Sequence, residues 1–262
     1  MKLTRTQRSS HANAERILES GNAHHVDERR AVIDGWHEGA AHNNAANSAF
    51  FTPWDIGFHL ALNVPQGGKL LDLCSGIGGL TAAVLDHGQT FDEIVLLELN
   101  PDYCEVARKI LPMAEVICGS IYDDVLLREL TSRGFRTVIS NPPFGNVSKP
   151  KGASGPRFKG EAHYEAIDMA SDIADYGVFI LPQQACPFAY SGRQGFTRIE
   201  NERYDRFSKA TGVELELGVA TDTTVLTPFR STTITVEIVT ADFSEARQRR
   251  QEAQGELFGI AA

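Results

Sequence analysis

Between residues 70 and 181, short apolar segments alternate with longer segments of helical character, and this alternation constrains the fold more than any other feature. Strands that are separated by helices of this length pair in parallel, because the chain must cross back over the sheet before each new strand. Such a sheet is covered by helices on both faces, and its strands are short and apolar. The expected strands are 70–73, 94–97, 116–118, 137–140 and 178–181.

Two further β-rich segments, 213–219 and 232–240, follow with no helix between them, so we expect an antiparallel pair at one edge of the sheet. The predicted fold class is therefore α/β, with a doubly wound, mostly parallel, seven-stranded sheet of Rossmann-like type and an antiparallel edge strand. Residues 1–49 are expected to form an N-terminal helical extension, 50–243 the sheet domain, and 244–262 a charged C-terminal tail.

Composition narrows the class of protein further. The chain of 262 residues carries a formal net charge of -9, which argues against a broad basic surface that coats nucleic acid. Its four cysteines contain no Cys-x-x-Cys pair and indicate reduced thiols, and its eight histidines form no metal-ligand pattern, so we expect no metal. We expect a cytoplasmic protein, because the sequence has no apolar run long enough for a membrane span and no secretory signal.

A glycine-rich turn follows the first expected strand in the sequence LDLCSGIGGLT. Gly76 and Gly78 permit positive φ angles and close approach of a ligand to the backbone, and an ordinary tight strand-to-helix turn is the alternative explanation. The second strand ends at Glu98, 20 residues after Gly78, which is the spacing of the acid that binds ribose hydroxyls in nucleotide-binding folds. Together the turn and the acid indicate a nucleotide site at the carboxyl ends of the strands.

The fourth strand runs directly into the tetrapeptide Asn141-Pro142-Pro143-Phe144. The two prolines stiffen the loop, and Asn141 is biased toward an extended conformation because it precedes a proline. The Asn141 side-chain oxygen and the Pro142 carbonyl are suited to accept the two N–H bonds of a planar amino group, while Phe144 offers a face for stacking on its ring. We therefore expect these four residues to be catalytic.

This combination resembles the S-adenosylmethionine-dependent amino-methyltransferases, whose signature is an Asn/Asp/Ser-Pro-Pro-aromatic loop. The segment FFTP, at 50–53, is similar to the one that lies over the methionine end of the cofactor in DNA N6-adenine methyltransferases. The resemblance covers residues 50–183 and implies that Asp72 anchors the methionine end, directly or through water. The cofactor-binding residues that it implies are Phe51, Thr52, Pro53, Asp72, Cys74, Gly76, Gly78, Glu98, Leu99, Ser120, Ile121 and Asn141.

The chain departs from the family pattern after the third strand. Ser120 stands where the family usually carries an acid that binds the adenine amino group, and Asp123, one turn later, is a possible substitute. Ile121 would then pack against the adenine.

The resemblance favours adenine in DNA as the substrate, and with it a restriction–modification or phage-associated role. An RNA amino-methyltransferase acting on adenine or guanine is the alternative. A protein-glutamine methyltransferase fits less well, because that class favours Tyr where Phe144 stands. A non-enzymatic module with the same fold would lack the Asn-Pro-Pro-Phe loop altogether.

The stretch NVSKPKGASGPRFKG after the catalytic tetrapeptide is locally basic and suits a phosphate backbone, although a solvated loop would look the same. Few residues remain beyond the fifth strand, so we expect short or relaxed sequence specificity, read by the loops around Arg193 and 229–230, or else a companion subunit. The substrate-binding candidates are Lys149, Lys151, Arg157, Lys159 and Arg193.

The tail contains Gln254-Gly255-Glu256-Leu257-Phe258, which resembles the peptide by which bacterial proteins dock on the DNA sliding clamp. An exposed Leu-Phe pair is a suitable anchor for an apolar pocket. The other interpretation is a tail that packs on its own domain.

Overall fold

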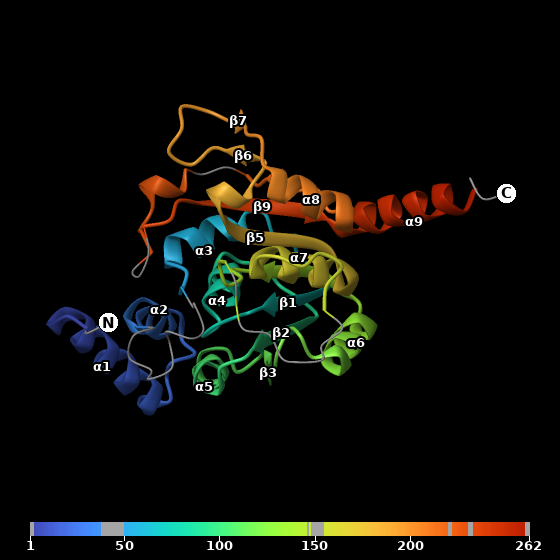
Figure 1. Ribbon diagram of the computed structural model, residues 1–262. Coiled ribbons are helices and arrows are strands. Elements are labelled where there is room, and N and C mark those ends of the chain that lie inside the picture. Colours follow the sequence, from blue (N-terminus) through green and yellow to red (C-terminus); the bar gives the residue numbers. More distant parts are fainter. Residues whose placement is uncertain are drawn as a thin grey trace.

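The computed structural model describes residues 3–37, 50–145, 147, 155–219, 222–229 and 233–259, with the side chains of 255–259 left aside. Its centre is a seven-stranded sheet with the strand order β3-β2-β1-β4-β5-β9-β8 (Figure 1). The strands are β1 Lys69–Leu73, β2 Glu93–Glu98, β3 Glu115–Cys118, β4 Phe135–Ser140, β5 Ala174–Pro182, β8 Glu216–Leu217 and β9 Val236–Asp242.

The predicted fold class is confirmed. Strands β1 to β5 pair in parallel, and β9 pairs antiparallel with both β5 and β8. The antiparallel pair at one edge is therefore also confirmed, with β8 as the edge strand and β9 inside it. The expected strand 213–219 is shorter in the structure, since only Glu216–Leu217 pair with β9.

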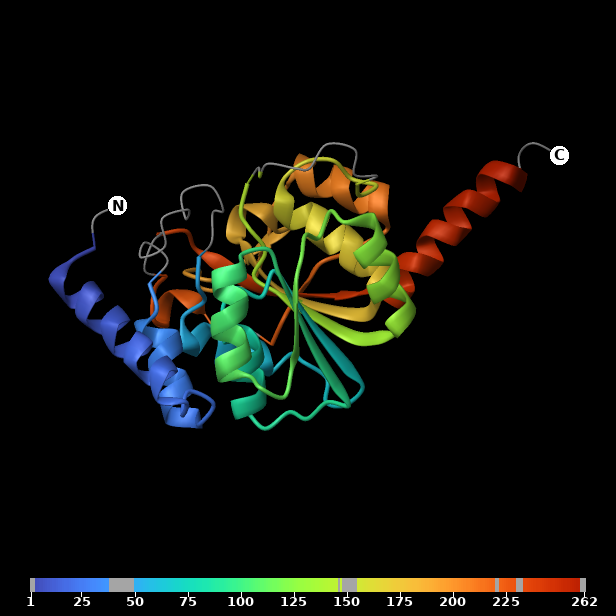
Figure 2. The ribbon, with the colours of Figure 1, turned by 90° about the horizontal axis from the view of Figure 1, so that it is seen from below.

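Helices cover both faces of the sheet (Figure 2). Alternate strand residues point to opposite faces, so Leu70 belongs to one apolar core and Leu71 to the other. The first core is completed by α3 Trp54–Ala61, α4 Gly79–Asp86 and α5 Pro101–Ile110. The second is completed by α6 Asp124–Arg133, α7 Ala162–Ile173, α8 Glu202–Thr211 and α9 Phe243–Gly259.

The N-terminal segment contributes two helices, α1 Arg5–Ser20 and α2 Val26–Gly35. They lie beside α4 and α5 (Figures 1 and 2), and Leu18 and Ile33 join the core on that face. A buried ion pair between Arg29 and Asp86 holds α2 to the end of α4. The expected extension is thus packed onto the sheet domain in its helical part.

Three smaller features complete the fold. A hairpin that the sequence did not predict, β6 Phe188–Ala189 with β7 Thr197–Arg198, projects from the body near the C-terminal strands (Figure 1). A 3-10 helix, η3 Gln183–Ala185, precedes β6. A second one, η4 Thr223–Val225, and its N-cap Asp222 bond Ser191 and Gly192 in the loop between β6 and β7. The expected charged tail is helical as far as Gly259, because it forms most of α9, which extends away from the domain (Figure 1). Among the described residues, no helix has the length and apolar character needed to span a bilayer.

Candidate active site

A cavity of about 480 Å³ opens at the carboxyl ends of the parallel strands, which is where an open α/β sheet binds its ligands. Residues 74–77 after β1, 97–99 at the end of β2, 119–122 after β3 and 141–143 after β4 form its wall. The glycine turn, the acid and the catalytic loop therefore meet, as the sequence predicts. The remaining lining residues are Ile33, Phe50, Phe51, Thr52, Gly79, Leu80, Tyr103 and Val147.

The glycine turn needs left-handed backbone at three positions, with φ of 61° at Cys74, 57° at Gly76 and 84° at Gly78. At Gly76, a Cβ atom would lie 3.1 Å from the Phe51 ring. At Gly78, it would lie only 2.7 Å from Cδ1 of Leu111, and Gly78 does not line the cavity. Gly78 is therefore required for packing against α5, and the expectation that it admits the cofactor is not met by its position.

Glu98 stands at the end of β2 and lines the cavity. Its Oε2 accepts a hydrogen bond from the Gly76 backbone N–H at 2.8 Å, and its Oε1 accepts one from the Asn100 N–H at 2.7 Å. Burial raises the pKa of the Glu98 carboxyl, and these backbone donors oppose the shift. The carboxylate thus fixes the glycine turn against β2 and presents an acceptor at the cavity wall.

Asp72 is fully buried behind the turn and does not line the cavity. Its Oδ2 accepts bonds from the Thr81 hydroxyl at 2.7 Å and the Thr81 N–H at 3.3 Å, while its Oδ1 has no hydrogen-bond partner among the described residues. Burial raises the pKa of Asp72 to about 7. Its observed contacts hold the start of α4, so a role at the methionine end of a cofactor would be indirect.

Asn141 joins two motifs that are far apart in the sequence. Its Nδ2 donates to the Phe50 carbonyl oxygen at 2.9 Å and to the Thr52 hydroxyl at 3.0 Å. Its Oδ1 is buried and has no partner within the described part of the chain. An unpaired buried acceptor costs free energy, so this oxygen is available for an N–H donor at the cavity. The segment before the glycine turn thus orients the Asn141 amide.

The other three residues of the tetrapeptide differ in whether they line the cavity. Pro142 and Pro143 line the cavity, whereas Phe144 does not. The Phe144 ring packs against Phe50 with centroids 5.9 Å apart and planes at 32°. The expected stacking face is therefore turned toward a neighbouring aromatic in this structure. Pro53 also lies outside the cavity wall, at the N-terminus of α3.

The loop after β3 places Ser120 and the buried Ile121 in the cavity wall, as expected. The Ser120 hydroxyl accepts from the Tyr122 N–H at 3.1 Å. Asp123, the possible substitute for the missing acid, instead caps α6 by accepting from the N–H groups of Val125 and Leu126 at 2.9 and 3.1 Å. Asp123 does not line the cavity, so the described residues of the loop after β3 present no carboxylate there.

Several lining residues escaped the sequence analysis. Tyr122 forms part of the wall and donates its hydroxyl to Glu165 Oε2 at 2.8 Å. Ser75 has a buried hydroxyl with no hydrogen-bond partner in the described ranges, and it lies inside the glycine turn that the sequence singled out. Ile33 comes from α2, and no local pattern near residue 33 connects that helix to the turn.

The candidate substrate residues are not gathered at one place. Lys149 and Lys151 lie outside the described residues. Arg157 is exposed, bonds Asp168 at 2.9 Å and Asp172 at 2.7 Å, and does not line the cavity, so its contact with a phosphate stays a prediction. Lys159 and Arg193 are exposed.

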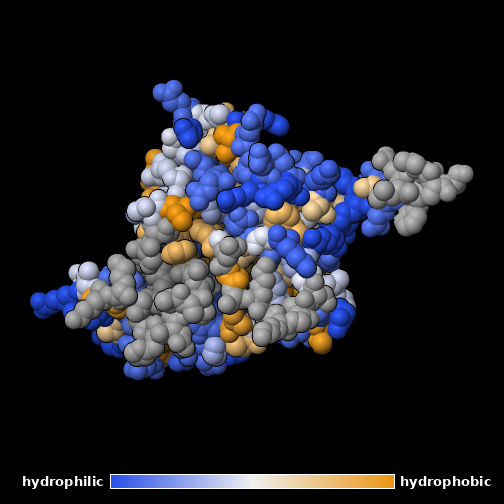
Figure 3. Space-filling model, in the orientation of Figure 1, coloured by the Kyte–Doolittle hydropathy of each residue, from blue (hydrophilic) through white to orange (hydrophobic). Residues whose placement is uncertain are grey.

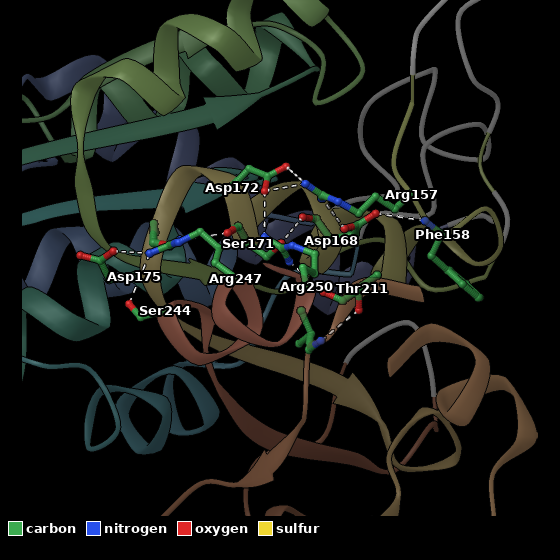
Figure 4. A network of polar contacts seen from close by, with 12 residues as sticks. Arg157, Phe158, Asp168, Ser171, Asp172, Asp175, Thr211, Ser244, Arg247 and Arg250 are labelled. Atoms are coloured by element: carbon green, nitrogen blue, oxygen red, sulfur yellow. Dashed lines mark hydrogen bonds and ion pairs between the residues drawn. The ribbon is translucent and has the colours of Figure 1, made fainter. Parts of the chain in front are cut away.

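The ion pairs of Arg157 extend into a network that reaches α9 (Figure 4). Asp172 also accepts from Arg250 at 3.1 Å, and Arg250 donates to the Thr211 carbonyl oxygen at 2.8 Å. The N–H of Phe158 donates to the buried Asp168 at 3.1 Å. The segment 157–158, which precedes α7, is thereby bonded to α7 and linked through Arg250 to the end of α8 and to α9.

Residues 55–163 match the family model described as Methyltransferase small domain. A protein described as a class I S-adenosylmethionine-dependent methyltransferase from Listeria monocytogenes has a similar fold, with a TM-score of 0.54 and 11% identity over 92% of this chain and 81% of that one. The methyltransferase subunit of a type I restriction–modification system from Streptococcus thermophilus has a TM-score of 0.53 and 18% identity over 85% of this chain and 50% of that one. None of the curated proteins compared matches the sequence.

The fold is thus the Rossmann-like fold of these S-adenosylmethionine-dependent methyltransferases, and the methyltransferase-domain match covers residues 55–163, which include the glycine turn, Glu98 and the Asn-Pro-Pro-Phe loop. The cofactor of this class fits the residues present. The cavity has the size of a small-molecule site. Glu98 offers a carboxylate, Ser75 an unpartnered hydroxyl, and Ile121 and Leu99 an apolar wall.

The expected sliding-clamp peptide, 254–258, falls on the last turns of α9. Gln254 is exposed, and the side chains of the other four residues lie outside the description. The clamp contact stays a prediction.

Proposed function

We propose that this protein transfers the methyl group of S-adenosylmethionine to the exocyclic amino group of adenine in DNA, with short or relaxed sequence specificity. The observation that carries the proposal is the state of Asn141. Its amide nitrogen is held by Phe50 and Thr52, which leaves Oδ1 as an unpaired acceptor at the wall of the cavity that Glu98 shares.

The chain's own residues account for binding and orientation. When bound, S-adenosylmethionine supplies a methyl group on a sulfonium that is already electrophilic, so the task of the protein is to position the acceptor nitrogen. The Asn141 Oδ1 and the Pro142 carbonyl oxygen accept the two N–H bonds of the amino group. This draws the nitrogen lone pair out of conjugation and directs it toward the methyl group. The N–C bond would form as the C–S bond of the sulfonium breaks and leaves a neutral thioether. The nitrogen would then give its proton to water, so no prior general base is needed.

Adenine in DNA is preferred because the FFTP segment contacts the catalytic loop directly. Phe50 and Thr52 hold the Asn141 amide, and Phe50 packs on Phe144. This supports the resemblance to the DNA adenine class, in which that segment belongs to the cofactor site. A duplex substrate must place its target base in the cavity by flipping it out of the stack. An RNA amino-methyltransferase is the alternative, and a glutamine methyltransferase is the next.

The test is transfer of a radiolabelled methyl group from S-adenosylmethionine to duplex DNA, to RNA and to protein, with wild type and Asn141→Ala. We expect transfer to adenine in DNA, and a fall on the order of 100-fold in Asn141→Ala because the amino group is no longer oriented. Cofactor affinity, measured by calorimetry, should stay close to that of wild type. Asn22→Ala, an exposed amide in the turn between α1 and α2, is the matched control and should be fully active.

Two results would contradict the proposal in different ways. Transfer to RNA but not to DNA would assign the alternative substrate. Full activity of Asn141→Ala on DNA would leave the substrate in place and remove the role given to Asn141.

A further inference from the structure

We infer that the β6–β7 hairpin is a DNA-contacting element that inserts or stacks Phe196 at the target site, with Arg193 and Arg198 on the flanking phosphates. The inference rests on the proposed function and adds to it the element that engages the duplex.

The hairpin and the Asn-Pro-Pro-Phe loop both leave the sheet at the carboxyl ends of its parallel strands. Strands β4 and β5 are parallel neighbours, with Ser140 opposite Phe179 in the register. Asn141 follows β4 directly, and η3 and the hairpin follow β5 after Pro182. Both segments therefore start at the carboxyl edge that carries the cavity, and the hairpin projects outward from there (Figure 1).

An exposed aromatic side chain, that of Phe196, stands directly before β7. Phe196 is 50% exposed, which is unusual for a phenylalanine, and its ring packs on the buried Phe188 with centroids 5.5 Å apart. The space-filling view shows a mostly hydrophilic surface with an apolar patch over this part of the molecule (Figure 3). The phenyl ring thus has a supported inner side and a free outer side, as a stacking platform for a base requires.

The charge of the hairpin suits a polyanion. Residues 183–199 contain two arginines and no acidic residue, in a chain with a net charge of -9. Arg193 and Arg198 are both exposed, and neither forms an ion pair with any residue that the structure describes. Arg157, by contrast, is occupied by Asp168 and Asp172. Two uncommitted guanidinium groups beside an exposed ring match phosphates on either side of an unstacked base.

A buried carboxylate anchors the segment before β6 and the start of the loop that follows it. Glu237 on β9 is 1% exposed, and its Oε1 accepts from the N–H groups of Tyr190 and Ser191 at 2.8 and 3.0 Å. It also accepts from Gln183 Nε2 at 2.7 Å, and its Oε2 accepts from the Ser191 hydroxyl at 3.0 Å. Four hydrogen bonds to one buried acid fix the direction in which the hairpin leaves the sheet. An element fixed in this way loses little conformational entropy on binding.

The test is the affinity of three proteins for a short fluorescein-labelled DNA duplex, measured by anisotropy over a range of salt concentrations. We expect Phe196→Ala to bind about tenfold more weakly through the loss of base stacking. Arg193→Gln combined with Arg198→Gln should lower the slope of log affinity against log salt by about two, one for each lost phosphate contact. Cofactor affinity should be unchanged in both, because neither variant alters the cavity wall.

Met113→Ala and Lys109→Gln are the matched controls, because both residues are exposed near the end of α5, before β3, at the opposite edge of the sheet. They should bind DNA like wild type. If the wild-type enzyme methylates DNA and the hairpin variants bind and react as it does, the inference is wrong while the proposed function stands. If wild type transfers methyl groups to RNA and not to DNA, the proposed function fails and the inference fails with it.

Discussion

The position of Asn141 depends on residues that precede the sheet domain's first strand. Phe50 and Thr52 bind its amide nitrogen, so the direction of its oxygen is set by a segment far away along the chain. The residue types of both motifs are readable in the sequence, but their contact is not. The contact of Phe144 is likewise not readable in the sequence. Its motif predicted that the ring stacks on the substrate, whereas in the structure the ring packs against Phe50.

Asp72 leads to a prediction about pH. In the folded protein burial raises the pKa of Asp72 to about 7, whereas an unfolded chain loses this proton near pH 4. Between these values the folded state binds more protons, so the contribution of Asp72 to stability falls as the pH rises. Asn cannot ionise, and we therefore expect Asp72→Asn to gain stability relative to wild type from pH 5 to pH 8. Urea unfolding at both pH values measures this, and a constant difference would contradict it.

At the scale of elements, the sequence predicted most helices and parallel strands within a few residues. Alternation of apolar strands with amphipathic helices is a local pattern, and local signals such as Asn100 and Pro101 at the start of α5 mark where helices begin. The hairpin of β6 and β7 was missed because its strands have two residues each and are held by Glu237, Asp222 and Thr223 from other segments.

Helix α2 gives a prediction of its own. Ile33 is 2% exposed, packs in the core beside α4 and lines the cavity. Ile33→Ala should lower the free energy of unfolding by about 2–5 kcal/mol, the usual cost of truncating a buried aliphatic side chain. It should also weaken cofactor binding, because the same side chain forms part of the wall. Denaturant unfolding and calorimetry measure the two effects.

Val26→Ala is the control on the same helix, since Val26 is 54% exposed. It should change stability by less than about 0.5 kcal/mol. Equal effects of the two substitutions would show that α2 does not serve the site through Ile33.

At the scale of the whole molecule, the distribution of charge matters more than its sum. The net charge of -9 includes acids that are engaged inside the protein, such as Asp168 and Asp172 in the network of Arg157 and Arg250 (Figure 4). That network joins the segment around Arg157, which leads into α7, to α7 itself and to α9. It therefore holds the C-terminal helix to the domain. The cations that we assign to DNA are Arg193 and Arg198 of the β6–β7 hairpin, which are exposed and form no ion pair with a described residue.

A small cationic zone on an acidic protein predicts strong salt dependence. We expect DNA affinity to fall on the order of 100-fold between 50 and 200 mM salt if about four phosphates are neutralised. Cofactor affinity should change far less over the same range, because that site is enclosed by the strand ends. Anisotropy titrations for DNA and calorimetry for the cofactor provide the comparison. An affinity for DNA that does not respond to salt would contradict a phosphate-based contact.

The sequence by itself determined the class of fold, the edge of the sheet that carries the site, and the two motifs at its centre. These follow from periodicity and turn chemistry, which act between residues close together along the chain. Tertiary structure decided which candidates face the cavity. Gly78 packs against Leu111, and Arg157 forms ion pairs with Asp168 and Asp172. Ser75 and Ile33 instead line the cavity. Such assignments depend on packing and ion pairing between separate segments, and no local pattern encodes those contacts.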